Sequence, residues 1–156
     1  MKQIDEIIYD AICADEDLME AIGNRVVSTC FEVSPEEADN TPLPNIIITD
    51  DGFQANMTTK DDIWEADEDR CQATVDIAAE SPVEVKQLVR AVRRAINNHV
   101  ILLSQQDEAI PALQSLTSDG IGWDWMRPSY YQKLYYTVDA DVDLSDENEN
   151  ENEQEG

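Results

Sequence analysis

One stretch in the middle of the chain constrains the fold more than any other, because it predicts a strand that leads directly into a helix. From residue 71 to residue 79, small or apolar side chains occupy every second position, the pattern of a strand with one buried face. Ser81 then suits the N-cap, Pro82 the first helical position, and Glu84 a capping box. We expect this helix to end near Asn97-Asn98. Its apolar face comprises Val85, Leu88, Val89, Val92 and Ile96.

Two further helices are predicted near the N-terminus. Apolar residues recur at helical spacing over residues 2–14, which indicates an amphipathic helix. Asp15 suits the N-cap of a second, short helix, and Gly23 suits its end because glycine readily adopts the left-handed conformation found there.

Several β-rich stretches complete the predicted secondary structure. The strands are expected over residues 25–33, 45–49, 53–59 and 134–144. A turn at Asp51-Gly52 would join the second of these to the third. Residues 112–126 fit either a hairpin or one bulged strand, and residues 99–111 are expected to form a loop. This succession of helices and strands indicates an α+β fold.

The chain is strongly acidic, with 35 aspartates and glutamates against 10 lysines and arginines, a net charge of −25. Residues 145–156 carry six of the acids and no base, so the remainder keeps 29 acids and a net charge of −19. We expect one domain over residues 1–144 and a disordered acidic tail over residues 145–156. Such a surface disfavours nucleic acid and anionic membranes as partners and favours basic proteins.

Neither a secretory signal nor a membrane-spanning helix is predicted. Asp5 and Glu6 follow closely on the N-terminal methionine, and no apolar stretch of a signal peptide comes after them. The longest aliphatic run, residues 100–103, is far shorter than the ~20 apolar residues that a spanning helix needs.

The sequence carries no recognisable catalytic arrangement, so we expect a protein that is not an enzyme and needs no cofactor. His99 is the single histidine and is expected just past a helix end, where a capping or surface role is usual. Cys13, Cys30 and Cys71 are widely spaced, which favours small buried thiols over a disulfide or a reactive thiol.

Metal binding is also disfavoured. Asp139, Asp141 and Asp143 have the spacing that begins a calcium loop, but the glycine and glutamate of that loop are missing. A solvated strand face is therefore the preferred interpretation. Weak binding of a divalent cation by these residues, or by Asp61 and Asp62, stays open.

Two charged segments are candidate contact sites. Four of the ten bases fall on one face of the central helix, namely Lys86, Arg90, Arg93 and Arg94. A solvated helix face is the ordinary explanation, and a basic stripe that forms an interface with an acidic neighbouring subunit is the functional one. Residues 60–69 are predicted to form an exposed acidic loop that contacts a partner. Its acids are Asp61, Asp62, Glu65, Asp67, Glu68 and Asp69.

Aromatic residues gather towards the C-terminal third of the chain. Trp123 and Trp125 would share one side of a strand, as would Tyr131 and Tyr135. Aromatic stripes of this kind usually belong to a core or to a subunit interface. Stacking on single-stranded nucleic acid would require more basic residues alongside them.

Taken in chain order, these elements resemble the bacteriophage tail-terminator or tail-completion family, which includes the lambda-type terminator. The likeness rests on a helix that ends at glycine before a strand, a strand after proline, the central strand and helix, and a closing strand. These segments are residues 17–26, 44–48, 70–96 and 134–142. The match is one of order, spacing and length over about residues 1–143.

The resemblance implies a single domain with helices on one side of a mostly antiparallel sheet. It also implies a hexameric ring that caps the tail tube and joins it to the head, as part of a virion assembled in the host cytoplasm. The partners would be further copies of the chain and the neighbouring tail-tube or head-connector proteins. DNA would pass through a negative lumen, to which residues 60–69 would contribute, without being bound.

Two alternatives stay open. The acidic tail and the acidic segment depart from the family pattern, which leaves another head–tail connector or neck protein as an alternative. The net charge also fits an acidic DNA mimic that inhibits a DNA-binding protein. A gel-shift competition with such a protein would distinguish the mimic from a virion subunit.

Overall fold

A computed structural model describes residues 3–23, 25–31, 36–37, 40–60, 63–105 and 113–141. Its helices are α1 (Ile4–Ala14), α2 (Glu16–Ile22) and α4 (Pro82–Gln105). Its strands are β1 (Val26–Ser28), β2 (Asn45–Lys60), β3 (Ile63–Ala79), β4 (Leu113–Ser118), β5 (Gly122–Asp124) and β6 (Ser129–Asp141).

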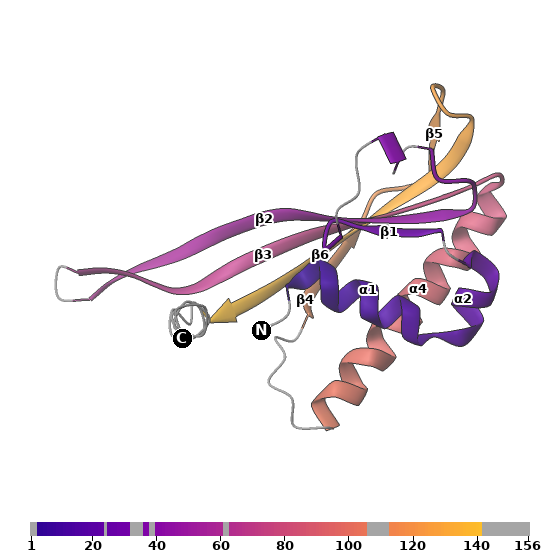
Figure 1. Cartoon of the computed structure of the whole chain (residues 1–156). Helices are drawn as coiled ribbons and strands as arrows, with labels where there is room; N and C mark the ends of the chain where they lie inside the picture. The colour runs from indigo at the N-terminus through magenta and orange to yellow at the C-terminus, as the bar shows by residue number, and fades with distance from the viewer. Residues whose placement is uncertain are drawn as a thin grey trace, which may run out of the picture.

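The strands form one sheet in the order β1-β2-β3-β6-β4, and β5 also pairs with β6. Only the β1–β2 pair is parallel among the described pairings. α1 and α4 lie side by side on one face of this sheet (Figure 1). The predicted α+β fold, with helices on one face of a mostly antiparallel sheet, is therefore confirmed.

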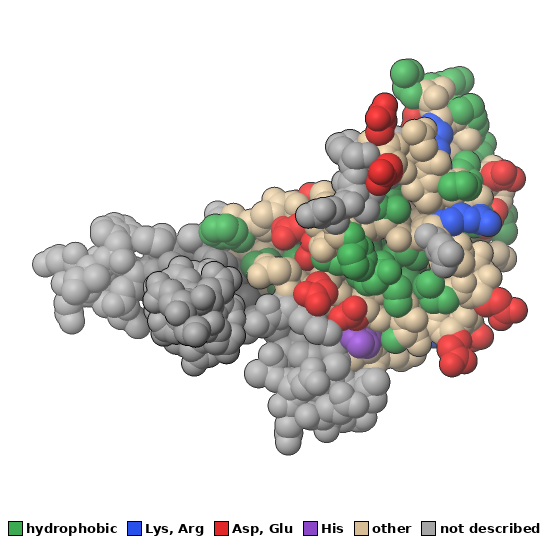
Figure 2. Space-filling view, viewed as in Figure 1, with side chains coloured by type: hydrophobic (Ala, Val, Ile, Leu, Met, Phe, Trp, Pro, Cys, Tyr) green, Lys and Arg blue, Asp and Glu red, His purple; other side chains and the backbone are tan. Residues whose placement is uncertain are grey.

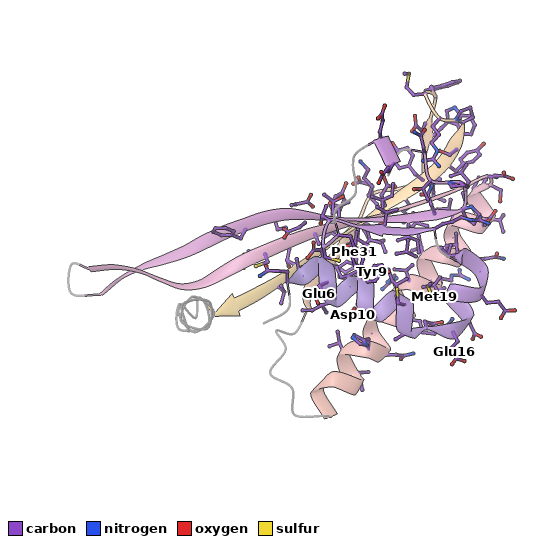
Figure 3. The ribbon with its side chains drawn as sticks, viewed as in Figure 1. Glu6, Tyr9, Asp10, Glu16, Met19 and Phe31 are labelled. Atoms are coloured by element: carbon purple, nitrogen blue, oxygen red, sulfur yellow. The ribbon has the colours of Figure 1, made fainter. Side chains whose placement is uncertain are left out.

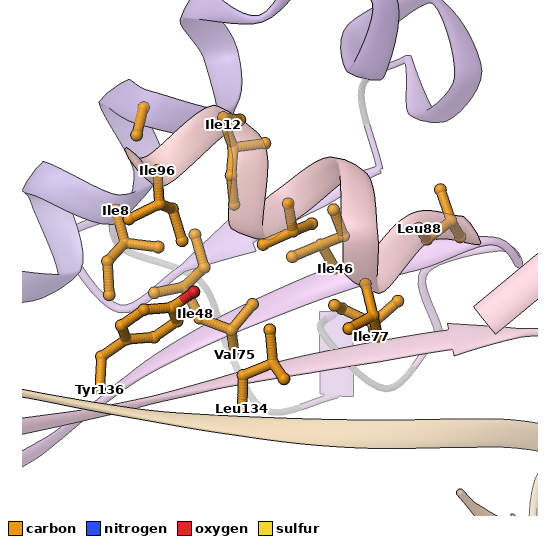
Figure 4. Close-up of a cluster of buried hydrophobic side chains, with 14 of the residues drawn as sticks. Ile8, Ile12, Ile46, Ile48, Val75, Ile77, Leu88, Ile96, Leu134 and Tyr136 are labelled. Carbon is orange, nitrogen blue, oxygen red and sulfur yellow. The ribbon is translucent and has the colours of Figure 1, made fainter. Parts of the chain in front are cut away.

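The core lies between these helices and the sheet face that they cover (Figure 4). Along β2, Ile46 and Ile48 are fully buried, whereas the intervening Ile47 points to the other face. Burial of each such side chain contributes about 1.5–3 kcal/mol. The remaining strands and the helices complete the core with Ile8, Ile12, Val75, Ile77, Val85, Leu88, Val92, Ile96, Leu134 and Tyr136.

The predicted N-caps at Asp15 and Ser81 and the predicted helix end at Gly23 are confirmed. The backbone N–H of Leu18 donates to the Asp15 carboxylate over 2.9 Å, and Gly23 ends α2 with φ at 65°. The backbone N–H of Glu84 donates to the Ser81 hydroxyl over 3.2 Å at the start of α4.

The predicted end of the central helix at Asn97-Asn98 is wrong, because α4 continues to Gln105. Residues 99–105 are therefore helical rather than part of a loop, and the loop prediction for residues 106–111 lies outside the described part of the chain. Asparagine within a helix costs less than about 1 kcal/mol. Val100 packs against the core beyond it, and such tertiary contacts extend the helix.

The predicted turn at Asp51-Gly52 is also wrong, because β2 runs through it to Lys60 as one strand. The register against β3 shifts between Asp50 and Gly52, which marks a β-bulge. Gly52 has a φ of 92° there, and its N–H donates to the Asp50 carboxylate over 2.8 Å. The glycine thus kinks a strand instead of reversing the chain.

The prediction of an acidic loop over residues 60–69 is wrong for residues 63–69, which belong to β3. Their backbone partners on β2 run from Lys60 to Ala55 and include no acid, whereas on β6 Glu68 pairs with Asp141. The β2–β3 hairpin projects well beyond the helices as an arm (Figure 1). Asp61 and Asp62, which join its strands in sequence, lie outside the described residues.

The strands at both ends of the sheet differ from prediction. Of the expected strand over residues 25–33, β1 covers Val26–Ser28, and the chain turns at Thr29; residues 32 and 33 lie outside the described part. β4 and β5 follow one another along the same side of β6, which favours the bulged-strand alternative over a hairpin. β6 begins at Ser129, before the expected Leu134.

α1 is tied to the turn after β1 by a polar and an aromatic contact. The Thr29 hydroxyl donates to the buried Asp5 carboxylate over 2.7 Å. Tyr9 and Phe31 pack edge to face with their ring centroids 4.6 Å apart (Figure 3). A hydrogen bond with Cys13 and burial raise the pKa of Tyr9 to about 12.

Candidate protein-interaction site

The basic stripe predicted on the central helix lies on the solvent side of α4. Lys86, Arg90, Arg93 and Arg94 are all exposed. None of them forms an ion pair with a carboxylate in the described part of the chain. The apolar face of the same helix packs on the sheet, so the stripe points away from the sheet.

The two ends of the stripe have different surroundings. Arg94 lines a hollow of about 520 Å³ between α2 and α4, together with Asp17 and Glu84. Arg93 lies on the opposite flank, where its charge acts on Tyr136. Burial raises the pKa of Tyr136 to about 12, and the positive charge of Arg93 opposes that rise. Lys86 and Arg90 are one helical turn apart and lie between these flanks, on the side of the helix that faces solvent.

The side chains of the predicted acidic residues lie outside the described part of the structure. Glu65, Asp67, Glu68 and Asp69 belong to the β3 side of the projecting arm. Their backbone pairing with β2 is described, and Asp61 and Asp62 lie outside the described residues. Their contact with a partner stays a prediction.

A hollow of about 730 Å³ lies on the sheet face opposite the helices. Its floor consists of residues that alternate with the core positions of β2, β3 and β6. Ile47, Asp76 and Lys133 lie across the three strands in register, since Ile47 pairs with Asp76 and Asp76 pairs with Lys133. Trp123 and Tyr131 form part of its wall. We refer to this hollow as the open-face pocket.

Two hydrogen-bond acceptors in the open-face pocket have no partner among the described groups. Asn45 is 1% exposed; its amide nitrogen donates to the Thr41 carbonyl over 2.9 Å, but its Oδ1 is buried without a donor. Oδ1 of Asp76 is likewise buried and unsatisfied. An unsatisfied buried polar atom costs about 1–3 kcal/mol, so both atoms favour an incoming donor.

The charges around Asp76 do not offset its burial. Burial raises the pKa of the Asp76 carboxyl, and Lys133 opposes the rise. Asp124 adds to the rise, and Arg127 opposes it more weakly. Lys133 is drawn instead towards the Tyr131 ring, with its Nζ 5.8 Å from the ring centroid.

An apolar tip borders this pocket. The Asp124 carboxylate accepts the N–H groups of Met126 and Arg127 over 3.0 and 3.3 Å, which holds the turn after β5. Trp125 and Met126 are consequently 85% and 95% exposed. Hydrophobic side chains gather at this end of the molecule, near β5 (Figure 2).

The prediction that Trp123 and Trp125 share one side of a strand is wrong, because β5 ends at Asp124 and Trp125 lies in the turn. The two rings nevertheless pack edge to face, with centroids 5.9 Å apart. Trp123 also packs on Tyr130 with centroids 4.7 Å apart. The aromatic residues are therefore partly core and partly exposed surface.

Other predicted positions lie away from the open-face pocket. His99 lies within α4 rather than past its end, and its buried Nδ1 has no partner among the described groups. Cys13, Cys30 and Cys71 are half-buried thiols rather than disulfides. The side chains of Asp139, Asp141 and Asp143 lie outside the description. No cluster of three metal-binding side chains occurs within the part that is described.

The open-face pocket was not predicted from the sequence. Asn45 directly precedes a run of three isoleucines, and Asp76 lies between Val75 and Ile77. Polar residues next to or within an apolar strand give little indication of a pocket, because outward-facing strand positions are polar in most sheets. The burial of both side chains depends on neighbours that are distant in sequence.

No helix within the described ranges is long and apolar enough to cross a membrane. No model of a known protein family matches the chain, and no curated protein matches it either. Among solved structures, a chain from the "Virion of native gene transfer agent (GTA) particle" is similar, with a TM-score of 0.48 and 11% sequence identity. The match covers 88% of this chain and 94% of that chain.

Proposed function

We propose that this protein is a structural virion subunit that assembles head to tail into a ring. The ring would cap a phage tail tube and join it to the head, as the resemblance in element order implies. The subunit would act through shape and charge, without catalysis and without a cofactor. It would be incorporated into the particle in the host cytoplasm.

The single observation that carries this proposal is the presence of two unlike surfaces on opposite sides of the sheet. The basic stripe on α4 faces one way, and the open-face pocket with its apolar tip faces the other. A contact between two different patches of identical subunits generates either a closed ring or an open filament. The two unsatisfied acceptors in the pocket and the exposed bases on the helix support a contact between these surfaces.

Two further features support assembly into a ring around DNA. The strong negative charge disfavours attachment to a duplex, so DNA would pass through a ring of these subunits without being gripped. The β2–β3 arm extends away from the core and provides backbone edges for contact with a neighbour (Figure 1). Tail-tube or head-connector proteins are the expected partners at the two rims.

Native mass spectrometry and electron microscopy of the full-length protein test this proposal. We expect closed rings, hexamers in the simplest case, either in the isolated protein or after addition of tail tubes from the same particle. A subunit that stays monomeric at all concentrations, alone and with tail tubes, would contradict it. Labelling the subunit in intact particles distinguishes a tail terminator from a neck protein closer to the head.

Charge reversal tests the part played by the basic stripe. Arg90→Glu combined with Arg93→Glu should weaken ring formation, and more strongly at low salt, because screening reduces the contribution of such contacts. Ring formation that is unchanged at low salt would remove α4 from the interface. The monomer fold should stay intact in this variant, since both side chains are exposed.

A further inference from the structure

The open-face pocket combines features that no internal contact explains. Asn45 is almost completely buried, yet its Oδ1 has no donor among the described groups. Oδ1 of Asp76 is unsatisfied in the same hollow. Buried acceptors without a donor destabilise an isolated subunit, and a donor from outside the chain would relieve both.

The chemistry of the pocket specifies the kind of donor. One acceptor is a carboxylate and the other an amide oxygen, so a group with several N–H donors and a positive charge satisfies both at once. Trp123 and Tyr131 provide aromatic surface beside them, on which a flat cation stacks favourably. A guanidinium has all these properties, whereas an ammonium lacks the flat shape.

We propose that the open-face pocket receives an arginine of α4 from a second copy of this chain, with Arg90 as the central residue. The inference rests on the proposed function, and it specifies which two surfaces meet in the ring. Arg90 is exposed, lies at the crest of the stripe, and has no ion pair within the described part of its own chain. Lys86 and Arg93 flank it on the same helix face.

The position of the two surfaces fits this pairing. The stripe points away from the sheet on the helix side, and the pocket opens on the other side, so Arg90 cannot reach the pocket of its own chain. A second copy is therefore the source. The exposed Trp125 and Met126 next to the pocket would be covered in the same contact, which removes apolar surface from water.

The charges already present explain why the acceptors need an external donor. Lys133 and Arg127 both lie near Asp76 and oppose the rise of its pKa, but burial and Asp124 raise it. Neither cation hydrogen-bonds to Asp76 Oδ1, which has no partner among the described groups. An arginine in contact with the carboxylate would stabilise its charged form.

A double-mutant cycle tests the pairing. The association constant of the ring is measured by analytical ultracentrifugation for wild type, Asp76→Asn, Arg90→Gln and the double variant. Each single change should weaken association by about tenfold or more, as close charge pairs at interfaces do. The double variant should associate about as weakly as the weaker of the two single variants, because both changes remove the same contact.

Two controls separate this contact from general charge effects. Arg94→Gln, which alters the neighbouring arginine on the α2 side, should combine additively with Asp76→Asn. Glu80→Gln removes one exposed acid near the same strand and should show no coupling to Arg90→Gln. Additive behaviour of Asp76→Asn and Arg90→Gln would overturn the pairing while leaving ring formation, and thus the proposed function, in place.

A small-molecule probe tests the pocket in the absence of assembly. N-acetyl-arginine methylamide, followed by NMR, should shift the side-chain amide signals of Asn45, whereas the neutral N-acetyl-citrulline methylamide should shift them far less. No difference between the two probes would overturn a guanidinium site. Binding of the arginine probe by a chain that never assembles would overturn the ring and the second copy as donor, but would leave the guanidinium chemistry of the pocket standing.

Discussion

The Thr29 hydroxyl donates a 2.7 Å hydrogen bond to the carboxylate of Asp5, a residue that is 4% exposed on α1. The same hydroxyl oxygen accepts the backbone N–H of Asp50 over 2.9 Å. One side chain thus connects the first helix to β2 through the turn after β1. Burial of the Asp5 carboxylate would destabilise the fold without a hydrogen-bond donor such as Thr29.

Replacement of Thr29 by valine should therefore destabilise the fold. Thr29→Val keeps the shape of the side chain but removes both hydrogen bonds, and we expect a loss of about 1–3 kcal/mol in the free energy of unfolding. Urea denaturation followed by circular dichroism measures it. Thr29→Ser retains the hydroxyl and is the matched control, with a smaller loss. Equal stability of the valine variant and wild type would show that water replaces these bonds.

Asp76→Asn should stabilise the subunit at neutral pH, although it weakens the proposed interface. Burial raises the pKa of Asp76 in the folded state above its unfolded value of 3.8. Protonated Asp76 is therefore tolerated in acid, and the folded state loses stability as the pH rises through the folded-state pKa. Removing the charge should therefore raise the free energy of unfolding at neutral pH. Melting curves of the monomer between acid and neutral pH measure the difference.

The pH dependence distinguishes this effect from a general change in packing. The advantage of Asp76→Asn should shrink as the pH falls towards 3.8 and vanish well below it, where the wild-type carboxyl is protonated in both states. Glu80→Gln, at an exposed position two residues before the start of α4, is the control. A constant advantage at every pH would mean that the charge of Asp76 is not its cause.

Gly52→Ala should destabilise the β2–β3 hairpin at its bulge. Gly52 has a φ of 92°, a conformation that alanine adopts at a cost of about 1–2 kcal/mol. No atom lies within 4 Å of an added methyl group, so backbone strain alone produces the loss. Gly120→Ala, with equally open surroundings and no positive φ, should change the unfolding free energy much less. Thermal melting of both variants tests the difference.

Ser81→Ala should weaken the start of α4. The Ser81 hydroxyl accepts the N–H of Glu84 over 3.2 Å, and loss of an N-cap side chain costs about 1 kcal/mol. Ser81→Asp keeps an acceptor at the same position and should restore most of this stability. Hydrogen exchange of the first amides of α4 locates the effect. Unchanged protection in the alanine variant would show that Pro82 alone fixes the helix start.

Local signals predicted the elements whose ends are fixed by short-range chemistry. The caps at Asp15 and Ser81 and the helix end at Gly23 involve atoms within a few residues of one another. The alternation in β3 also reports directly which side chains face the core. The extension of α4 to Gln105 and the continuation of β2 through Gly52 were missed, because contacts with distant strands and helices decide both.

The sequence by itself determined the fold class, the strong negative charge and the position of four exposed bases on one helix face. The charge follows from composition, and the fold class and the helix face follow from periodicity over short stretches of the chain. Only the tertiary structure decided that Asn45, Asp76 and Lys133 meet on the face opposite that helix. The physical reason is that strand pairing brings together residues far apart in sequence, and burial of an acceptor depends on all of them at once.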